Sequence, residues 1–297
     1  EDMQPCKTEY VERVNTHFID FKDHPLLTFI RNDENIGIDF STVGLMYKNF
    51  ETFEFDTVYT KELEYLGLTE KTLDSMRPLL KDFYQKSEFN EFFKSNETYY
   101  KRAIAKIEKQ VIGEKLFDKM IHFYQVEQKG LELIVFVELT NNANNRAVDF
   151  YDKYNPEKGA LILANFCEMP DEATDLNEVL ELDNSIRGVL YHEISHLFTT
   201  KLLDKYIGNL EQYKSICEDC SAIEIRDKVD HMIVRPLQAI LMERFGNNSQ
   251  GTDFYLNKSK DASKDIYQRL SEFRPENEIP FENVYIECIK LIQESSP

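Results

Sequence analysis

The chain has 297 residues, of which 42% are hydrophobic, and this allows one large domain or two small ones with a real core. Its 54 acidic residues outnumber its 35 basic ones, so the net charge of −19 repels a phosphate backbone and argues against nucleic acid as a partner. No run of about 18 apolar residues occurs, so the sequence predicts no transmembrane segment.

The first part of the chain, to about residue 125, is dense in helix formers and phenyl rings. One helix is predicted over 102–124, because apolar residues recur there near helical spacing: Ile104, Ile107, Val111, Leu116 and Met120. An aromatic stripe precedes it, and we interpret it as core packing rather than a binding platform: Phe83, Phe89, Phe92 and Phe93. The scattered histidines of this part are not expected to bind metal: His17, His24 and His122.

The middle of the chain predicts a small sheet. The runs "LELIVFVEL" (131–139) and "GALILANF" (159–166) are short and rich in aliphatic or β-branched residues, and turn-forming residues surround them. We expect both to be strands of one sheet and near neighbours in it.

The helical period returns after residue 180 and continues to the C-terminal end. One predicted helix contains the stretch "YHEISHLF" (191–198), with apolar residues on one side of it. In a later helical stretch, Pro236 predicts a kink or a new start, and Gly246 predicts a helix end.

The stretch "YHEISHLF" contains an H-E-x-x-H pattern. On a helix, His192 and His196 project from one face, one turn apart, so both imidazoles can reach one metal ion, and zinc suits that geometry. Glu193 then lies where it can take a proton from the attacking water and pass it to the leaving amine. The alternative interpretation is two polar residues on an ordinary helix.

A catalytic zinc ion needs a third protein ligand. The downstream candidates are Glu211, Glu218, Asp219, Glu224, Asp230 and His231. His231 is favoured, because histidine is rare in this chain and because it lies in an amphipathic stretch able to pack beside the motif helix. Glu224 is the second choice, since a glutamate on the following helix is the other common solution. A surface or core histidine remains the competing interpretation of His231.

Three further residues are candidates for contacts with substrate or with the oxyanion of the tetrahedral intermediate. Arg235 is one helical turn past His231, although an arginine there more often pairs with a surface carboxylate. Tyr206 and Tyr213 lie between the two helices, and the sequence does not select between them.

The five cysteines are too few and too sparse to predict a disulfide framework. Cys217 and Cys220 form a C-x-x-C pair, which is compatible with a disulfide, half of a zinc site or two helical neighbours. Because the sequence has no second C-x-x-C, a structural zinc site there is not favoured.

Several stretches together resemble one family over about residues 10–245. They are "DHPLLTFIRNDENIGIDFSTVGLMY", "FYQKSEFNEFFKSNETYY", the predicted sheet, "HEISHLFTTKLL" and "DHMIVRPLQAI". They look like an uncharacterised bacterial family, catalogued as a domain of unknown function, of exported H-E-x-x-H zinc metallopeptidases. The aromatic block and the H-E-x-x-H are its specific parts.

The resemblance implies a ligand set and a location. The family's last block reads Asn-Glu, an apolar pair and Val-Arg, and its glutamate looks like the third zinc ligand. Asp230 and His231 stand at the first two places here, whereas Val234 and Arg235 agree with the pattern. The resemblance also implies an exported protein, periplasmic or at the cell surface. Glu1 is not preceded by an initiator methionine, so we expect any targeting segment to lie outside this sequence.

The sequence therefore predicts an α+β, predominantly helical, zincin-like fold. We expect one unit over 1–297, with a helical part (1–125), a sheet and active-site helix (126–200) and a helical C-terminal part (201–297). The predicted function is a metallopeptidase that binds Zn²⁺ and acts on peptide or protein substrates. The alternatives are a catalytically inactive binding or scaffold protein of similar fold, and a zinc hydrolase of non-peptide amides or esters. The sequence specifies neither the oligomeric state nor the cleavage specificity.

Overall fold

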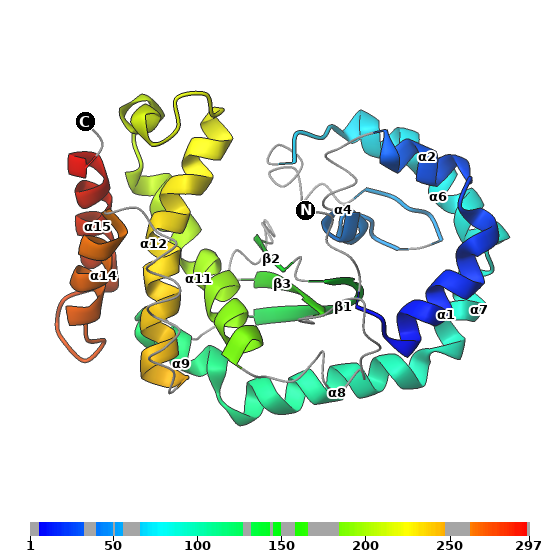
Figure 1. Cartoon of the computed structure of the whole chain (residues 1–297), viewed down its shortest axis with the longest axis horizontal. Coiled ribbons are helices and arrows are strands. Elements are labelled where there is room, and N and C mark those ends of the chain that lie inside the picture. The colour runs from blue at the N-terminus through cyan, green and yellow to red at the C-terminus, as the bar shows by residue number, and fades with distance from the viewer. Residues whose placement is uncertain are drawn as a thin grey trace. The chain divides into compact units, whose positions relative to one another are not determined.

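The computed structural model describes residues 6–32, 40–49, 51–55, 66–126, 132–142, 145–149, 158–165, 184–246 and 262–295. It is predominantly helical with a small mixed sheet, which confirms the predicted α+β class (Figure 1). The chain divides into two compact units: unit 1, Glu1–Glu108 with Glu132–Glu181, and unit 2, Lys109–Leu131 with Leu182–Pro297. No helix of the described ranges is long and apolar enough to cross a membrane.

Unit 1 contains short helices and the sheet. Threonine side chains begin two of the helices, because Thr8 and Thr69 each accept a hydrogen bond from a backbone N–H of the first helical turn. The helical elements of unit 1 are α1 (Glu9–Phe18), η1 (Ile19–Phe21), α2 (Pro25–Arg31), α4 (Phe40–Leu45), α6 (Glu70–Lys86), α7 (Phe89–Ser95) and most of α8 (Glu97–Gly113).

The sheet has the strand order β1-β3-β2 (Figure 1). β1 (Glu132–Asn142) pairs in parallel with β3 (Lys158–Asn165), and the short β2 (Arg146–Asp149) pairs with the other side of β3 in antiparallel orientation. The two predicted strands are thus confirmed as neighbours. The sequence did not predict β2, whose four residues are too few to show a period.

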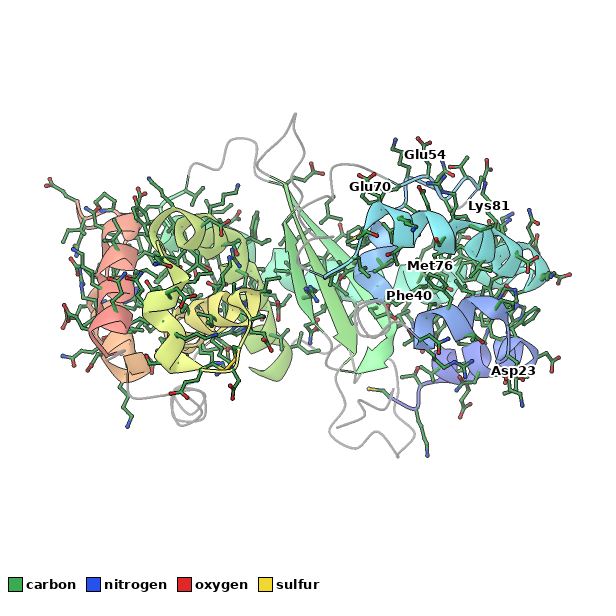
Figure 2. All side chains as sticks on the ribbon, turned by 90° about the horizontal axis from the view of Figure 1, so that it is seen from above. Asp23, Phe40, Glu54, Glu70, Met76 and Lys81 are labelled. Carbon is green, nitrogen blue, oxygen red and sulfur yellow. A yellow bond between two sulfur atoms is a disulfide. The ribbon has the colours of Figure 1, made fainter. Side chains whose placement is uncertain are left out.

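The helical core of unit 1 gathers around α6. Met76 of α6 is fully buried with its apolar neighbours, whereas Glu54 and Glu70 are exposed (Figure 2). Phe53 and Phe55 are buried in the same core, whereas Glu54 between them is exposed. Burial of these side chains is the main force that holds the short helices of this unit together.

Unit 2 is a helical assembly built around one buried helix. Its helical elements, besides the end of α8, are α9 (Leu116–Phe123), α11 (Asn184–Tyr206), η3 (Leu210–Ile216), α12 (Ala222–Phe245), α14 (Ala262–Glu272) and α15 (Phe281–Ser295). α12 packs against α11 on one side and against α14 and α15 on another (Figure 1). Its middle turns are accordingly apolar and almost fully buried: Ile233, Val234, Leu237, Ile240 and Leu241.

The single helix predicted over 102–124 is wrong. α8 ends at Gly113 and α9 begins at Leu116, and Lys115 between them has a left-handed φ of 50°. Glycine weakens a helix interior and commonly ends a helix, so the signal for this break was present in the sequence.

Candidate metal centre

Two helices of unit 2 carry the candidate site. α11 contains the H-E-x-x-H stretch, and α12 lies beside it. α12 begins with a capping box, in which the side chain of Ser221 accepts from the N–H of Glu224 and the carboxylate of Glu224 accepts from the N–H of Ser221. Pro236 lies inside α12 and does not start a new helix, and Gly246 caps its end as predicted.

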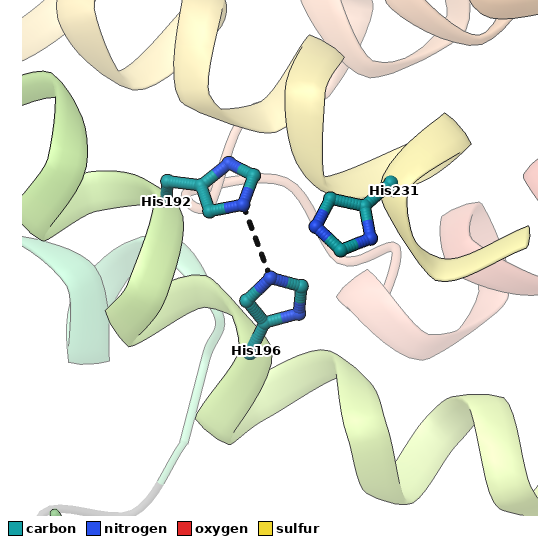
Figure 3. Close-up of side chains that lie close together, drawn as sticks. All are labelled: His192, His196 and His231. Carbon is teal, nitrogen blue, oxygen red and sulfur yellow. Dashed lines mark hydrogen bonds between the residues drawn. The ribbon is translucent and has the colours of Figure 1, made fainter. Parts of the chain in front are cut away.

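Three histidines converge between these helices. His192 and His196 project from α11, one turn apart, and His231 faces them from α12 (Figure 3). One ring nitrogen of each lies within 4.8 Å of the others, and the Nε2 atoms of His192 and His196 are 3.2 Å apart. The structure therefore brings together the three residues predicted as metal ligands.

The other ring nitrogen of each histidine is already hydrogen-bonded to the protein. Nδ1 of His196 donates to Oδ2 of Asp230 at 2.7 Å, and Nδ1 of His192 donates to Oε1 of Gln238 at 3.1 Å. Nδ1 of His231 donates to the backbone carbonyl of Asp227 at 2.9 Å. Because each Nδ1 carries the hydrogen, each neutral imidazole has its lone pair on Nε2, the nitrogen that faces the centre of the cluster (Figure 3).

These hydrogen-bond partners are themselves held in place. Nε2 of Gln238 donates to the carbonyl of Gly188 at 2.8 Å, which fixes the orientation of the amide. The hydroxyl of Thr199 lies 3.3 Å from Oδ1 of Asp230, and both residues are buried. Such supporting contacts orient metal-binding imidazoles and raise their basicity.

The electrostatic environment differs between the two motif histidines. Burial lowers the pKa of His192 well below its usual value, and the neighbouring His196 and His231 act in the same direction. Burial also acts to lower the pKa of His196, but the carboxylate of Asp230 raises it overall, with a smaller contribution from Glu193. A cation at the centre suits both rings, because it binds the neutral lone pairs and is compensated by the charge of Asp230.

The spacing of the two motif histidines matches that of two ligands of one tetrahedral metal ion. Two nitrogens bound to one zinc ion at about 2.0–2.1 Å lie about 3.3–3.4 Å apart, close to the 3.2 Å between His192 and His196. Without an ion, an N–H···N hydrogen bond joins these two atoms, which requires one of the two rings to carry a hydrogen on both nitrogens, and a bound cation would take the place of that hydrogen (Figure 3). Three imidazole donors suit zinc among the common metals, although copper, nickel and iron also accept them. His192, His196 and His231 can thus hold a metal ion.

Glu193 and Arg235 flank the cluster without joining it. Glu193 follows His192 on α11, is partly buried, and its charge raises the pKa of His196. Arg235 is exposed on α12, and its charge acts to lower the pKa of His192. Both charges therefore act on the rings of the cluster.

Other predicted residues have different partners. The hydroxyl of Tyr206 donates to Oε1 of Glu282, and the buried hydroxyl of Tyr213 accepts from Nε2 of Gln293 at 2.9 Å. The carboxylate of Glu224 is used in the capping box of α12, where the N–H of Ser221 lowers its pKa. The structure brings His231, and not Glu224, to the other two histidines.

The remaining predicted ligand candidates do not belong to the histidine cluster. Asp230 supports His196 through a hydrogen bond, whereas Glu211, Glu218 and Asp219 are exposed in the segment between α11 and α12. In that segment Cys217 and Cys220 form a disulfide, so they do not form half of a zinc site.

Sequence reasoning missed the supporting roles of Gln238 and Asp227. A signal was present for Gln238, which lies seven positions after His231 on the same face of the helix, but not for Asp227, whose contact is made by a backbone carbonyl that any residue type provides.

Comparison with protein-family models, with curated proteins and with solved structures finds no match for the chain. The resemblance to exported zinc metallopeptidases therefore stays a prediction.

Proposed function

We propose that the chain is a zinc-dependent metallopeptidase of the H-E-x-x-H type with a zincin-like fold. The observation that carries the proposal is the orientation of the three imidazoles: every Nδ1 donates to the protein, and every Nε2 faces one point. A polar helix face has no need of three fixed tautomers. A metal site does, because the ligands must keep their lone pairs aimed before the ion arrives.

The chemistry follows from the residues around that point. A zinc ion held by His192, His196 and His231 would supply a Lewis acid for the scissile carbonyl and for the attacking water. Glu193, next to the first ligand, takes the proton from the attacking water and delivers it to the leaving amine. Arg235, exposed one turn beyond His231, is suited to binding a carboxylate of the substrate.

The proposed location is outside the cytoplasm, at the cell surface or in the periplasm. The family resemblance implies it. The disulfide between Cys217 and Cys220 supports it, because disulfides persist mainly in oxidising compartments.

The first experiment is elemental analysis of purified protein after exposure to zinc and removal of the excess. We expect about one zinc ion per chain in the wild type, a sharp loss in His231→Ala and no loss in Glu224→Ala, which removes a carboxylate from the same helix. A wild type that binds no zinc would overturn the proposal, and so would equal losses in the two variants while both remain folded.

The second experiment separates an enzyme from a scaffold. Glu193→Gln preserves size and removes the base, so we expect zinc to be retained and cleavage of a peptide library to be lost. Glu211→Gln is the control. It makes the same change at an exposed position in the segment between α11 and α12, and we expect it to keep wild-type cleavage. If the zinc-loaded wild type cleaves no peptide, ester and non-peptide amide substrates decide between a hydrolase of another class and a non-catalytic protein.

A further inference from the structure

Unit 1 contains a cleft that is separate from the histidine cluster of unit 2. It has a volume of about 480 Å³, and its walls are formed by α1, α7, α8 and β1. All four elements contribute aromatic rings to it, among them Tyr10, Phe18, Phe89, Tyr100 and Phe136. Both the volume and the largely apolar lining are typical of sites for small organic molecules.

Among the described residues that line this cleft, Glu138 is the one with a charged side chain. Its Oε2 accepts from the hydroxyl of Ser41 at 2.7 Å, and its Oε1 accepts from the N–H of Thr140 at 2.9 Å and from the hydroxyl of the same threonine. A carboxylate has about four acceptor positions, so these donors leave one position on Oε2. The ion pairs within the described ranges do not include Glu138, and the neutral donors leave its negative charge uncompensated.

The rim of the cleft exposes large apolar side chains. Phe93 is 50% exposed and Ile104 is 52% exposed, and both line the cleft. Phe93 stacks on Tyr100 with ring centroids 4.7 Å apart. The predicted core stripe is thus divided: Phe83 packs against the core of unit 1, whereas Phe93 has much of its ring available to a ligand.

We propose that this cleft binds a small organic amine in its ammonium form, with an alkyl or aromatic body. The ammonium group supplies a positive charge beside Glu138 and an N–H for the remaining acceptor position on Oε2, and the body covers the rings that line the walls. An anion is disfavoured by the same carboxylate and by the net charge of −19, which attracts cations to the whole protein. The inference rests on the residues of unit 1 and is independent of zinc binding in unit 2.

The test is isothermal titration calorimetry of the full chain with three probes of equal length: hexylammonium, 1-hexanol and hexanoate. We expect saturable binding of hexylammonium, at least tenfold weaker binding of 1-hexanol and no binding of hexanoate. Raising the salt concentration should weaken hexylammonium binding and leave 1-hexanol unaffected. Equal affinity for hexylammonium and 1-hexanol would overturn the proposal, as would saturable binding of none of the three.

Two variants locate the site. Glu138→Gln should weaken hexylammonium about tenfold and leave 1-hexanol unchanged, whereas Glu91→Gln, an exposed position of α7 outside the cleft, should change neither. Phe93→Ala removes a ring that is 50% exposed at the rim, and it should weaken the binding of both ligands. Ile19→Ala, which is 58% exposed and outside the lining, is its control. Wild-type binding of hexylammonium by both Glu138→Gln and Phe93→Ala would exclude this cleft as the site.

Discussion

Replacement of Asp230 by asparagine tests whether the contacts behind the histidines are part of a metal centre. The carboxylate of Asp230 accepts the Nδ1–H of His196 at 2.7 Å, and the residue is only 4% exposed, so solvent screens this contact little. Asparagine has the same shape and still offers a carbonyl oxygen to Nδ1 and an amide to the hydroxyl of Thr199. The substitution therefore removes the charge while preserving the packing.

The expected loss follows from the difference between two hydrogen bonds. A hydrogen bond to a charged acceptor contributes about 1.5–3 kcal/mol and a neutral one about 0.5–1.5 kcal/mol. The difference of about 1.4 kcal/mol corresponds to tenfold weaker zinc binding. This agrees with the 10–100-fold losses that are typical when a contact behind a metal ligand is removed. Asp230→Ala also leaves Nδ1 of His196 without an acceptor, so its loss of zinc affinity should lie at the upper end of that range.

The assay is competition for zinc with a chromogenic chelator, with circular dichroism as the check on folding. Asp204→Asn is the matched control, because Asp204 also joins α11 to α12 through Arg226 but is half exposed and makes its ion pair away from the imidazoles. Wild-type zinc affinity in a folded Asp230→Asn variant would refute the reasoning that Asp230 orients a metal ligand. Equal losses in Asp230→Asn and Asp204→Asn would instead indicate a general loosening of the helix pair.

Three further predictions concern stability, each measured by urea unfolding. Ser221→Ala removes the cap of α12 and should cost about 1 kcal/mol without changing zinc content; an unchanged midpoint would mean that the capping box contributes nothing. Tyr124→Phe removes a buried 2.7 Å hydrogen bond to Ser195 and should cost about 1 kcal/mol, and a more stable variant would contradict this. Arg187 lowers the pKa of Glu114, so their pair stabilises the fold above the usual carboxylate pKa and loses its effect as the pH falls. Glu114→Gln should therefore be less stable than wild type at neutral pH by up to about 1 kcal/mol, with a gap that closes in acid; a gap that widens would reverse the assigned sign.

The two motif histidines of the cluster were predictable because their pattern is local. His192 and His196 are one helical turn apart in the sequence, and any helix over these residues places them on one face. His231 required an inference about a second helix, and the rarity of histidine in this chain made it the best candidate. The structure agrees because α12 packs directly beside α11.

The role of Asp230 was not predictable in the same way. Neighbouring residues on a helix point about 100° apart, so Asp230 and His231 cannot both face the same point. Which of them joins the histidine cluster and which supports His196 depends on how α12 is rotated against α11, and that rotation is set by the packing of residues such as Ile233 and Leu237. No periodicity within α12 reports it, because the helix is buried on nearly all sides.

The aromatic stripe also shows that residue type alone does not predict how deeply a side chain is buried. Phe92 and Phe93 are adjacent and equally apolar, so their types do not distinguish them, yet Phe92 is 7% exposed and Phe93 is 50% exposed. Both rings line the cleft, but Phe92 also packs against Tyr10 of α1, whereas Phe93 lies at the exposed rim. The pattern of the stripe predicts that rings will gather, but only the packing partners decide how much of each ring is exposed. A charged residue on another element, here Glu138, is what turns such a ring cluster from core into a candidate binding site.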